Sequence, residues 1–261
     1  MPRRSMYIWK LKQIIDAEGS VARVVERAKR AQLSALWVKI ADGASAYPNV
    51  TGGMAATFTN LVTRCHAAGI EVWGWQVPHC ATVAAANNEA ANAGMLGAQF
   101  GLDGLIMDAE AGALFFHGGV AEADAYAYAR AMRAAAAQMG KPLALSSHDI
   151  PQGQAGWLPK FDRLAAHADL NYPQVYYGSS PSVSHRLDRA ENSNAHLTIP
   201  FCPVGAGWIG DGGGCASGSA CAERAREFIR LVRDRQHQEY SFWHWAGAPS
   251  ALWEVLNTTP P

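Results

Sequence analysis

The stretch Leu102–Glu110 reads LDGLIMDAE and is the most informative part of the chain. An Asp-Gly turn leads into a short apolar run that ends in two carboxylates, Asp108 and Glu110. Residues two apart on a β-strand point to the same face, roughly 6.6 Å from each other along the axis. Holding two carboxylates together on one face costs free energy, because each disfavours the ionisation of the other. The stretch therefore predicts a strand whose carboxyl end carries an acidic pair with a chemical task.

Similar apolar runs recur along the chain and alternate with longer Ala-, Arg- and Glu-rich runs of helical period. The expected strands are Met6–Lys10, Ala35–Ile40, Glu71–Val77, Gly104–Asp108, Leu143–Ser147, Leu170–Tyr177, Leu197–Val204 and Tyr240–Trp245. The expected helices are Val21–Ala31, Met54–Ala68, Ala84–Phe100, Ala121–Met139, Leu158–His167, Ser182–Asn192, Cys221–His237 and Ala251–Leu256. Gly69 and Gly140 stand where left-handed residues would end two of these helices.

Eight strand–helix units in 261 residues predict parallel strands joined by right-handed crossovers. This number of units fits a closed (β/α)₈ TIM barrel, formed by residues 1–261 as a single domain, better than an open sheet. The chain has no Gly-x-Gly-x-x-Gly after its first strand and no P-loop, which makes a nucleotide-binding fold less well supported. The segment Gly205–Gly218 is expected to be a mobile loop after the seventh strand.

The composition of the chain limits the kinds of partner that it is expected to bind. The net charge is zero and the isoelectric point about 7.1, so the chain lacks the basic field that nucleic acid requires. No stretch of about 18 apolar residues is present, so no membrane span is expected. The N-terminal basic residues are not followed by an apolar run, and they do not resemble a signal peptide. Localisation stays open between the cytoplasm, a phage-type lysin and export by another route.

The five cysteines show no zinc-ligand spacing, and neither a metal nor a cofactor is expected. Cys215 and Cys221 flank a Gly/Ser loop and would pair in an oxidising compartment, but free thiols are the preferred interpretation. No paired-histidine spacing is present either, so His79, His148 and His244 are expected to line a polar cleft.

In a (β/α)₈ barrel the active site lies at the carboxyl ends of the strands. Polar and aromatic residues gather at these ends, and those expected to bind substrate are Asp42, Trp75, His148, Gln174, Tyr177, Trp243 and Trp245. Gln174 and Tyr176 share one face of a strand and are suited to positioning a carbonyl or a developing oxocarbenium ion. The tryptophans are candidate platforms for sugar rings, although a packing role is equally well supported for each. Asp42 would hold sugar hydroxyls, but an Asp next to Gly is most often turn chemistry.

A pair of carboxylates is the usual set of catalytic groups for cleaving a glycosidic bond. Glu110 is the expected general acid, which protonates the leaving oxygen, and Asp108, deeper in the barrel, would hold a proton or a hydrogen bond and orient a substrate group. The alternative is structural: Asp108 caps the next segment and Glu110 pairs with a surface arginine. The position of both at a central strand end favours catalysis.

The stretch Asp103–Glu110 resembles the signature Asp-Gly-x-Asp-x-Asp-x-Glu of glycoside hydrolase family 18. Gln174–Tyr177 resembles the Gln-x-Tyr of its plant-type members, and Phe242–Trp245 resembles a tryptophan motif of the last strand. The resemblance implies substrate-assisted cleavage, in which the substrate's acetamide oxygen is the nucleophile. Glu110 is then the acid, Asp108 steadies the N-acetyl group and Tyr176 assists. Two departures stand out: Ile106 replaces the middle Asp, and Trp73-Gly74-Trp75 replaces a Ser-x-Gly-Gly run.

Family 25 lysozymes are similar in barrel and Asp-x-Glu pair, but they carry an Asp on the first strand, where this chain has Tyr7–Lys10. Both resemblances imply a polysaccharide partner that contains N-acetylhexosamine, either chitin or peptidoglycan. Two other functions stay open. One is a barrel that binds sugar without cleaving it, against which the retained Glu110 argues. The other is an aldolase-like enzyme that uses Lys39, which would need a buried lysine with a lowered pKa.

Overall fold

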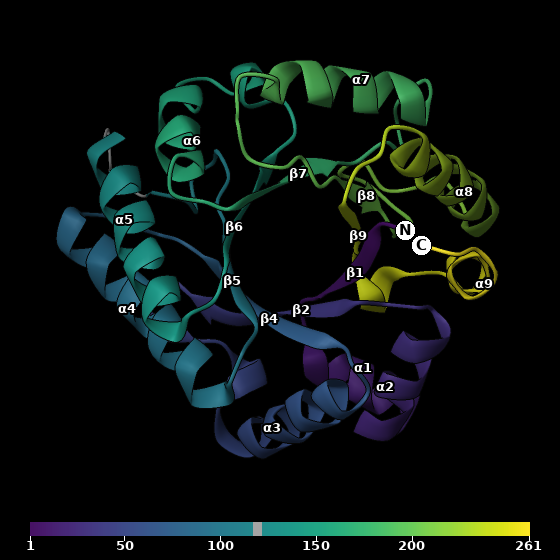
Figure 1. Ribbon diagram of the computed structural model, residues 1–261, viewed down its shortest axis with the longest axis horizontal. Coiled ribbons are helices and arrows are strands. Elements are labelled where there is room, and N and C mark those ends of the chain that lie inside the picture. The colour runs from purple at the N-terminus through teal and green to yellow at the C-terminus, as the bar shows by residue number, and fades with distance from the viewer. Residues whose placement is uncertain (117–121) are drawn as a thin grey trace.

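A computed structural model describes residues 1–116 and 122–261. A closed ring of strands forms the centre of the molecule, and helices surround it (Figure 1). The described strands are β1 (Arg3–Ile8), β2 (Ala35–Asp42), β3 (Ser45–Ala46), β4 (Glu71–Val77), β5 (Gly104–Asp108), β6 (Leu143–His148), β7 (Leu170–Val175), β8 (Val204–Ala206) and β9 (Glu239–Trp243). All pair in parallel around the ring except β3, which lies antiparallel to β2, and pairing of β1 with both β9 and β2 closes the barrel. The predicted (β/α)₈ fold is confirmed.

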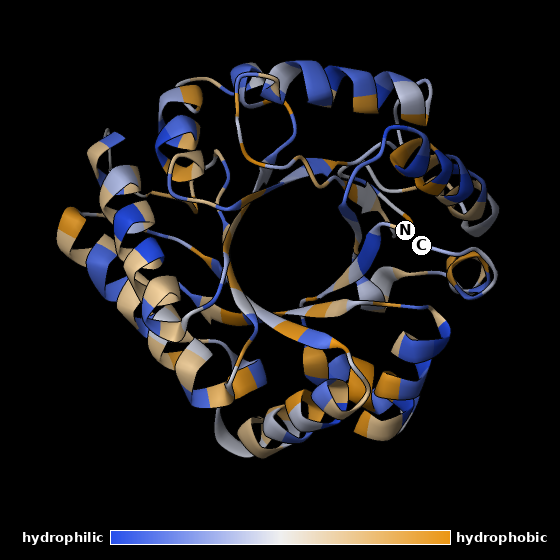
Figure 2. Ribbon diagram, in the orientation of Figure 1, coloured by the Kyte–Doolittle hydropathy of each residue, from blue (hydrophilic) through white to orange (hydrophobic). Residues whose placement is uncertain are grey.

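The helices lie where the crossovers require them. They are α1 (Leu11–Glu18), α2 (Val21–Arg30), α3 (Gly52–Ala67), α4 (Val83–Phe100), α5 (Glu122–Met139), α6 (Leu158–Ala165), α7 (Val183–Asn194), α8 (Gly218–Asp234) and α9 (Ser250–Thr258). Gly69 and Gly140 follow α3 and α5 with φ of 72° and 65°, as predicted. Helix α1 was not predicted; the first expected helix began only at Val21. The expected start of α5 at Ala121 falls outside the described residues. Figure 2 shows α7 as largely hydrophilic, in keeping with its position on the outside of the barrel.

Two strand boundaries differ from those predicted. Strand β1 begins at Arg3, not Met6, because the barrel accommodates the charge of Arg4. The fully buried Arg4 guanidinium donates to the Tyr240 hydroxyl at 2.7 Å and to carbonyl oxygens of Ala31, Leu256 and Thr259 at 2.7–2.8 Å. These bonds replace the lost hydration and tie the first strand to the C-terminal helix, so the two chain ends lie together (Figure 1).

Strand β8 is shorter and later than predicted, running over Val204–Ala206 instead of Leu197–Val204. The preceding residues include Pro200 and Pro203, which have no N–H to donate to a sheet. This segment meets β7 only at an isolated bridge between Asn171 and Phe201.

The barrel interior is filled by side chains at every second strand position. Tyr7, Trp37, Ile106 and Tyr172 belong to one buried cluster, and the rings of Trp37 and Tyr172 stack 4.2 Å apart although β2 and β7 are not neighbours. Gly104 leaves room for a ring, because a Cβ there would lie 2.3 Å from the Trp73 indole. The middle of the barrel is therefore packed, which confines any substrate to its two ends.

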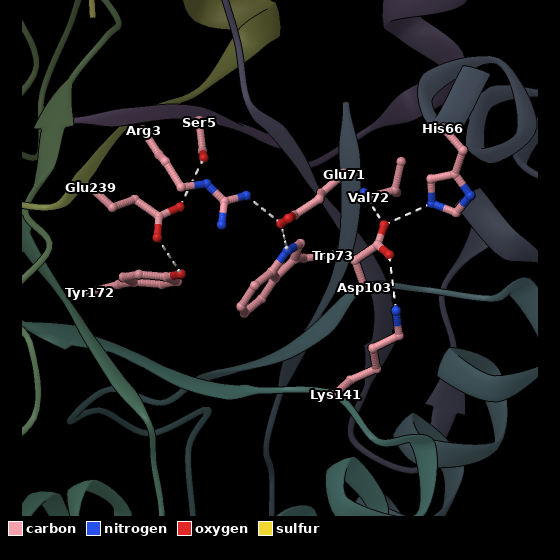
Figure 3. Close-up of polar contacts among 10 residues, drawn as sticks. All are labelled: Arg3, Ser5, His66, Glu71, Val72, Trp73, Asp103, Lys141, Tyr172 and Glu239. Atoms are coloured by element: carbon pink, nitrogen blue, oxygen red, sulfur yellow. Dashed lines mark hydrogen bonds and ion pairs between the residues drawn. The ribbon is translucent and has the colours of Figure 1, made fainter. Parts of the chain in front are cut away.

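The amino-terminal end of the barrel is closed by a polar network (Figure 3). Arg3 bonds Glu71 at 2.5 Å, and the Trp73 indole donates to the same carboxylate at 2.8 Å. The buried Glu239 accepts from the hydroxyls of Ser5 at 3.2 Å and Tyr172 at 3.3 Å. Nearly every charge here has a partner within the network, so this end has the character of a structural plug.

The segment after β8 is tied down instead of free. Cys215 and Cys221 form a disulfide, which corrects the expectation of free thiols; the short loop brings their Cα atoms within 5.2 Å. The Gly178 N–H donates to the Gly213 carbonyl at 2.9 Å, and the Cys215 N–H donates to the Trp208 carbonyl at 2.7 Å. These links hold the segment predicted to be a mobile loop. Cys65, Cys80 and Cys202 are buried free thiols. In the described part of the chain, no helix is long and apolar enough to cross a membrane.

Candidate active site

Asp108 occupies the top interior position of β5 and is 5% exposed. It lies one layer above Ile106, which fixes its direction toward the barrel axis. Its Oδ1 atom accepts hydrogen bonds from the Ser146 hydroxyl on β6 at 2.8 Å and from the Gln174 amide on β7 at 3.3 Å. Three consecutive strands thus converge on one carboxylate. Among the described residues, Oδ2 accepts no hydrogen bond and remains available to a ligand.

Gln174 connects the two predicted catalytic carboxylates. Its Nε2 atom also donates to Glu110 Oε1, at 2.9 Å. Because both oxygens lie near one nitrogen, at 3.3 and 2.9 Å, they are no more than about 6 Å apart. Glu110 itself is only partly buried. The structure therefore brings Asp108, Glu110 and Gln174 together, with Glu110 on the solvent side. Within the part of the chain that the structure describes, Glu110 forms no ion pair with an arginine.

Burial, followed by the charge of Glu110, raises the pKa of Asp108 to about 7. The Ser146 hydrogen bond and the Lys39 charge act in the opposite direction. The acidic pair consequently retains a proton on Asp108 near neutral pH. Burial, followed by the Glu110 charge, also raises the pKa of Tyr176 well above its ordinary value, so its phenol remains a hydrogen-bond donor. This half-buried ring meets the Trp208 ring edge-on, with centroids 4.9 Å apart.

His148, at the end of β6, acts on the segment that follows Glu110. The Ala111 N–H donates to His148 Nε2 at 3.0 Å, which requires a neutral imidazole with its proton on Nδ1. The ring also meets Trp157 edge-on. The observed contact of His148 orients the backbone next to Glu110, and its role in substrate binding stays a prediction.

Asp42, at the end of β2, is held by the side chains of Lys39 and His79. Lys39 Nζ lies 2.7 Å from Oδ2, and His79 Nε2 lies 2.6 Å from Oδ1. Despite the cost of its partial burial, these contacts lower the pKa of Asp42. Lys39 also lies over the rings of Tyr47 and Trp75, at 4.6 and 5.2 Å. An ammonium group in an ion pair is a poor nucleophile, so this arrangement argues against the aldolase-like alternative.

Three predicted substrate-binding residues do not face a cleft. Trp75 is 1% exposed, and its indole donates to the carbonyls of Ile8 and Trp37 at 3.3 and 3.1 Å. Tyr177 points to the opposite face from Tyr176, as adjacent strand-end residues do, and packs on Phe228. Trp245 lies beyond the end of β9 and packs on Trp253 of α9. These predictions were wrong because the residue types alone do not distinguish a platform from core.

The structure adds residues that sequence reasoning did not place in the site. Ser146 is one, and its position two before His148 on a strand already assigned to the site was an available signal. Trp9 and Trp208 are two others; they are 39% exposed and partly exposed, respectively. Trp243 is partly exposed and contacts Trp9, with ring centroids 6.5 Å apart, and its role in substrate binding stays a prediction. Within residues 1–116 and 122–261, no cluster of three or more His, Cys, Asp or Glu side chains is arranged to hold a metal ion.

A (β/α)₈ barrel with an acidic pair at the carboxyl ends of its strands has the architecture of many glycoside hydrolases. No protein-family model and no curated protein sequence matches the chain. Solved structures match its fold at low sequence identity, and family 18 enzymes are prominent among them. A family 18 chitinase from Pseudoalteromonas aurantia is 13% identical with a TM-score of 0.67, covering 96% of this chain and 97% of that chain.

A family 18 N-acetylglucosaminidase from Paenibacillus barengoltzii is 11% identical with a TM-score of 0.66, covering 98% of this chain and 99% of that chain. The spore cortex-lytic enzyme SleL from Bacillus megaterium is 9% identical with a TM-score of 0.63, covering 98% of this chain and 73% of that chain. At these identities the comparisons establish that the chain shares the barrel fold of these enzymes.

Proposed function

We propose that this protein is a glycoside hydrolase that cleaves a polysaccharide containing N-acetylhexosamine. The observation that carries the proposal is the Gln174 amide, which bonds both Asp108 and Glu110 at the carboxyl end of the barrel. The shared fold with family 18 chitinases and glucosaminidases supports the same class of substrate. Chitin and peptidoglycan both belong to this class.

In the proposed reaction the proton of the acidic pair lies on Glu110 once substrate is bound, which leaves Asp108 ionised, and Glu110 donates this proton to the glycosidic oxygen as the bond from that oxygen to C1 breaks. The acetamide oxygen of the same sugar attacks C1 and forms a cyclic oxazolinium, whose N–H is held by the free Oδ2 of Asp108. Water then adds to C1, and the Glu110 carboxylate accepts its proton. In this proposal the Tyr176 hydroxyl donates a hydrogen bond to the acetamide. A water-activating pair in an inverting enzyme stands about 6.5–9.5 Å apart, so the closer spacing here favours retention of configuration.

The test compares the wild type with Glu110→Gln on purified peptidoglycan and on chitin, with mass analysis of the products. Cleavage by the wild type and its loss in Glu110→Gln, by at least about a thousandfold, are expected, because the amide cannot donate the proton at a useful rate. Glu223→Gln on the exposed face of α8 is the matched control and should cleave normally. Wild-type rates in Glu110→Gln would exclude this residue as the acid. Binding without cleavage by the wild type would favour the non-catalytic barrel.

A further inference from the structure

Trp9 is exceptional among the tryptophans of this chain. Six of the nine are buried, whereas Trp9 is 39% exposed at the carboxyl end of β1. Leaving much of an indole in water forgoes a large part of the free energy that its burial would contribute. A single exposed aromatic residue on a surface needs no explanation, but this one stands at the end of the barrel that carries the acidic pair.

The backbone that carries Trp9 is fixed from beneath by a buried amide. Asn49, which is 3% exposed, donates from Nδ2 to the carbonyls of Trp9 at 2.8 Å and Lys39 at 2.9 Å. Its Oδ1 accepts from the Leu11 N–H at 2.8 Å. One side chain thus clamps both sides of the Trp9–Lys10 segment. An exposed ring on an anchored backbone has the preorganisation of a binding platform, because little further order has to be imposed when a ligand arrives.

The platform is continuous with the candidate active site. Strands β1 and β9 are neighbours (Figure 1), and the Trp9 ring lies 6.5 Å from the Trp243 ring with an interplanar angle of 30°. Trp243 in turn contacts the rings of Tyr7 and Trp75 inside the barrel, at 5.3 and 5.7 Å. A series of aromatic contacts therefore runs from the barrel interior, where Trp75 of β4 lies on the strand paired with β5, to the rim at Trp9.

The charge at the rim is opposite to that of the acidic pair. The ammonium of Lys10 lies 4.6 Å from the centre of the Trp9 ring. Among the described residues Lys10 has no carboxylate within ion-pair distance, unlike Lys39, which is paired with Asp42. An anionic sugar would be repelled beside Asp108 and Glu110 but attracted beside Lys10. The position beside Asp108 and Glu110 therefore suits a neutral sugar, and the position beside Lys10 suits an acidic sugar.

We propose that Trp9 and Lys10 form an outer sugar subsite that binds a carboxylate-bearing hexosamine of the substrate polymer, adjacent to the neutral N-acetylhexosamine held at Asp108 and Glu110. This inference rests on the proposed function and narrows its substrate to a polymer in which neutral and acidic hexosamines alternate. Trp9 supplies the stacking face for the ring, and Lys10 supplies the charge that selects the acidic sugar.

The test measures binding calorimetrically in a Glu110→Gln background, so that no turnover is needed. One probe is a neutral N-acetylglucosamine tetramer; the other is a tetramer in which N-acetylglucosamine alternates with N-acetylmuramic acid that has a free lactyl carboxylate. Trp9→Ala should weaken binding of both about tenfold, whereas Trp9→Phe, which keeps an aromatic face, should lose less. Lys10→Ala should weaken only the acidic tetramer, about threefold to tenfold at low salt, with the loss shrinking as salt rises.

Lys12→Ala, at an exposed lysine of α1 that pairs with Asp16, is the matched control and should leave both affinities unchanged. If Trp9→Phe and Trp9→Ala both fold and bind both tetramers as tightly as the parent protein, Trp9 is not a binding platform. If Lys10→Ala weakens binding of both tetramers equally, Lys10 does not select the acidic sugar. Because binding is read without cleavage, either failure is separable from a failure of the hydrolase proposal, which only the activity of the wild type decides.

Discussion

Replacing Asp108 by Asn is expected to stabilise the protein, and increasingly so as the pH rises. The native-state pKa of Asp108 is raised from 3.8 to about 7, chiefly by burial and then by the Glu110 charge. The native state therefore keeps a proton that the unfolded chain releases at lower pH. Wherever the native state binds more protons, the free energy of unfolding falls as the pH rises, here between about pH 4 and pH 7.

The size of the effect follows from the raised pKa. Each unit corresponds to about 1.4 kcal/mol, so the cost of ionising Asp108 in the native state approaches about 4 kcal/mol above pH 7. At pH 4.5 only about 1 kcal/mol of this cost is present, because Asp108 is still protonated in the folded protein. The neutral Asn side chain carries none of it. The stability advantage of Asp108→Asn should thus grow by about 3 kcal/mol between pH 4.5 and pH 8.

Urea unfolding followed by tryptophan fluorescence at the two pH values measures this difference directly. Asp211→Asn, in an exposed loop, is the matched control and should show no such growth. In a Glu110→Gln background the growth should shrink, because the second-largest cause of the raised pKa is removed. A stability difference between Asp108→Asn and the wild type that stays constant from pH 4.5 to pH 8 would refute the argument. Confirmation would mean that the candidate active site keeps Asp108 although its ionisation lowers the stability of the folded protein.

The other predictions concern the supports of the site. Ser146→Ala removes the hydroxyl that donates to Asp108 at 2.8 Å, so it should raise the pKa of Asp108 further and reduce turnover on the order of tenfold. An unchanged pH–rate profile in Ser146→Ala would contradict this. Mass analysis without reductant should find a linked peptide containing Cys215 and Cys221, and two free thiols would refute the bridge. Replacing both cysteines by serine should cost about 2 kcal/mol in chemical unfolding. It should lower turnover as well, because the Cys215 N–H donates to the Trp208 carbonyl at 2.7 Å and the bridge holds Cys215 in place.

Much of the site was predictable because the rule that places it is local. Alternation along a strand puts Asp108 above Ile106, and the same rule puts Gln174 and Tyr176 on one face. The rule that barrel strands present their carboxyl ends to the site then assembles these residues without knowledge of any contact. The Gly stops at residues 69 and 140 were predictable for the same reason, because a left-handed helix cap is a property of a few consecutive residues.

The alternating apolar runs of the sequence thus determined the barrel and the position of its acidic pair, since both depend on short-range periodicity. Only the tertiary structure decided which aromatic rings are core and which are platforms, because burial depends on neighbours distant in sequence. Trp75 and Trp9 illustrate this: both follow the pattern of a strand end, but the rings of Tyr7 and Trp243 cover the first, while the second extends to the rim. The proton on Asp108 is likewise a tertiary property, set by burial and by groups from several strands.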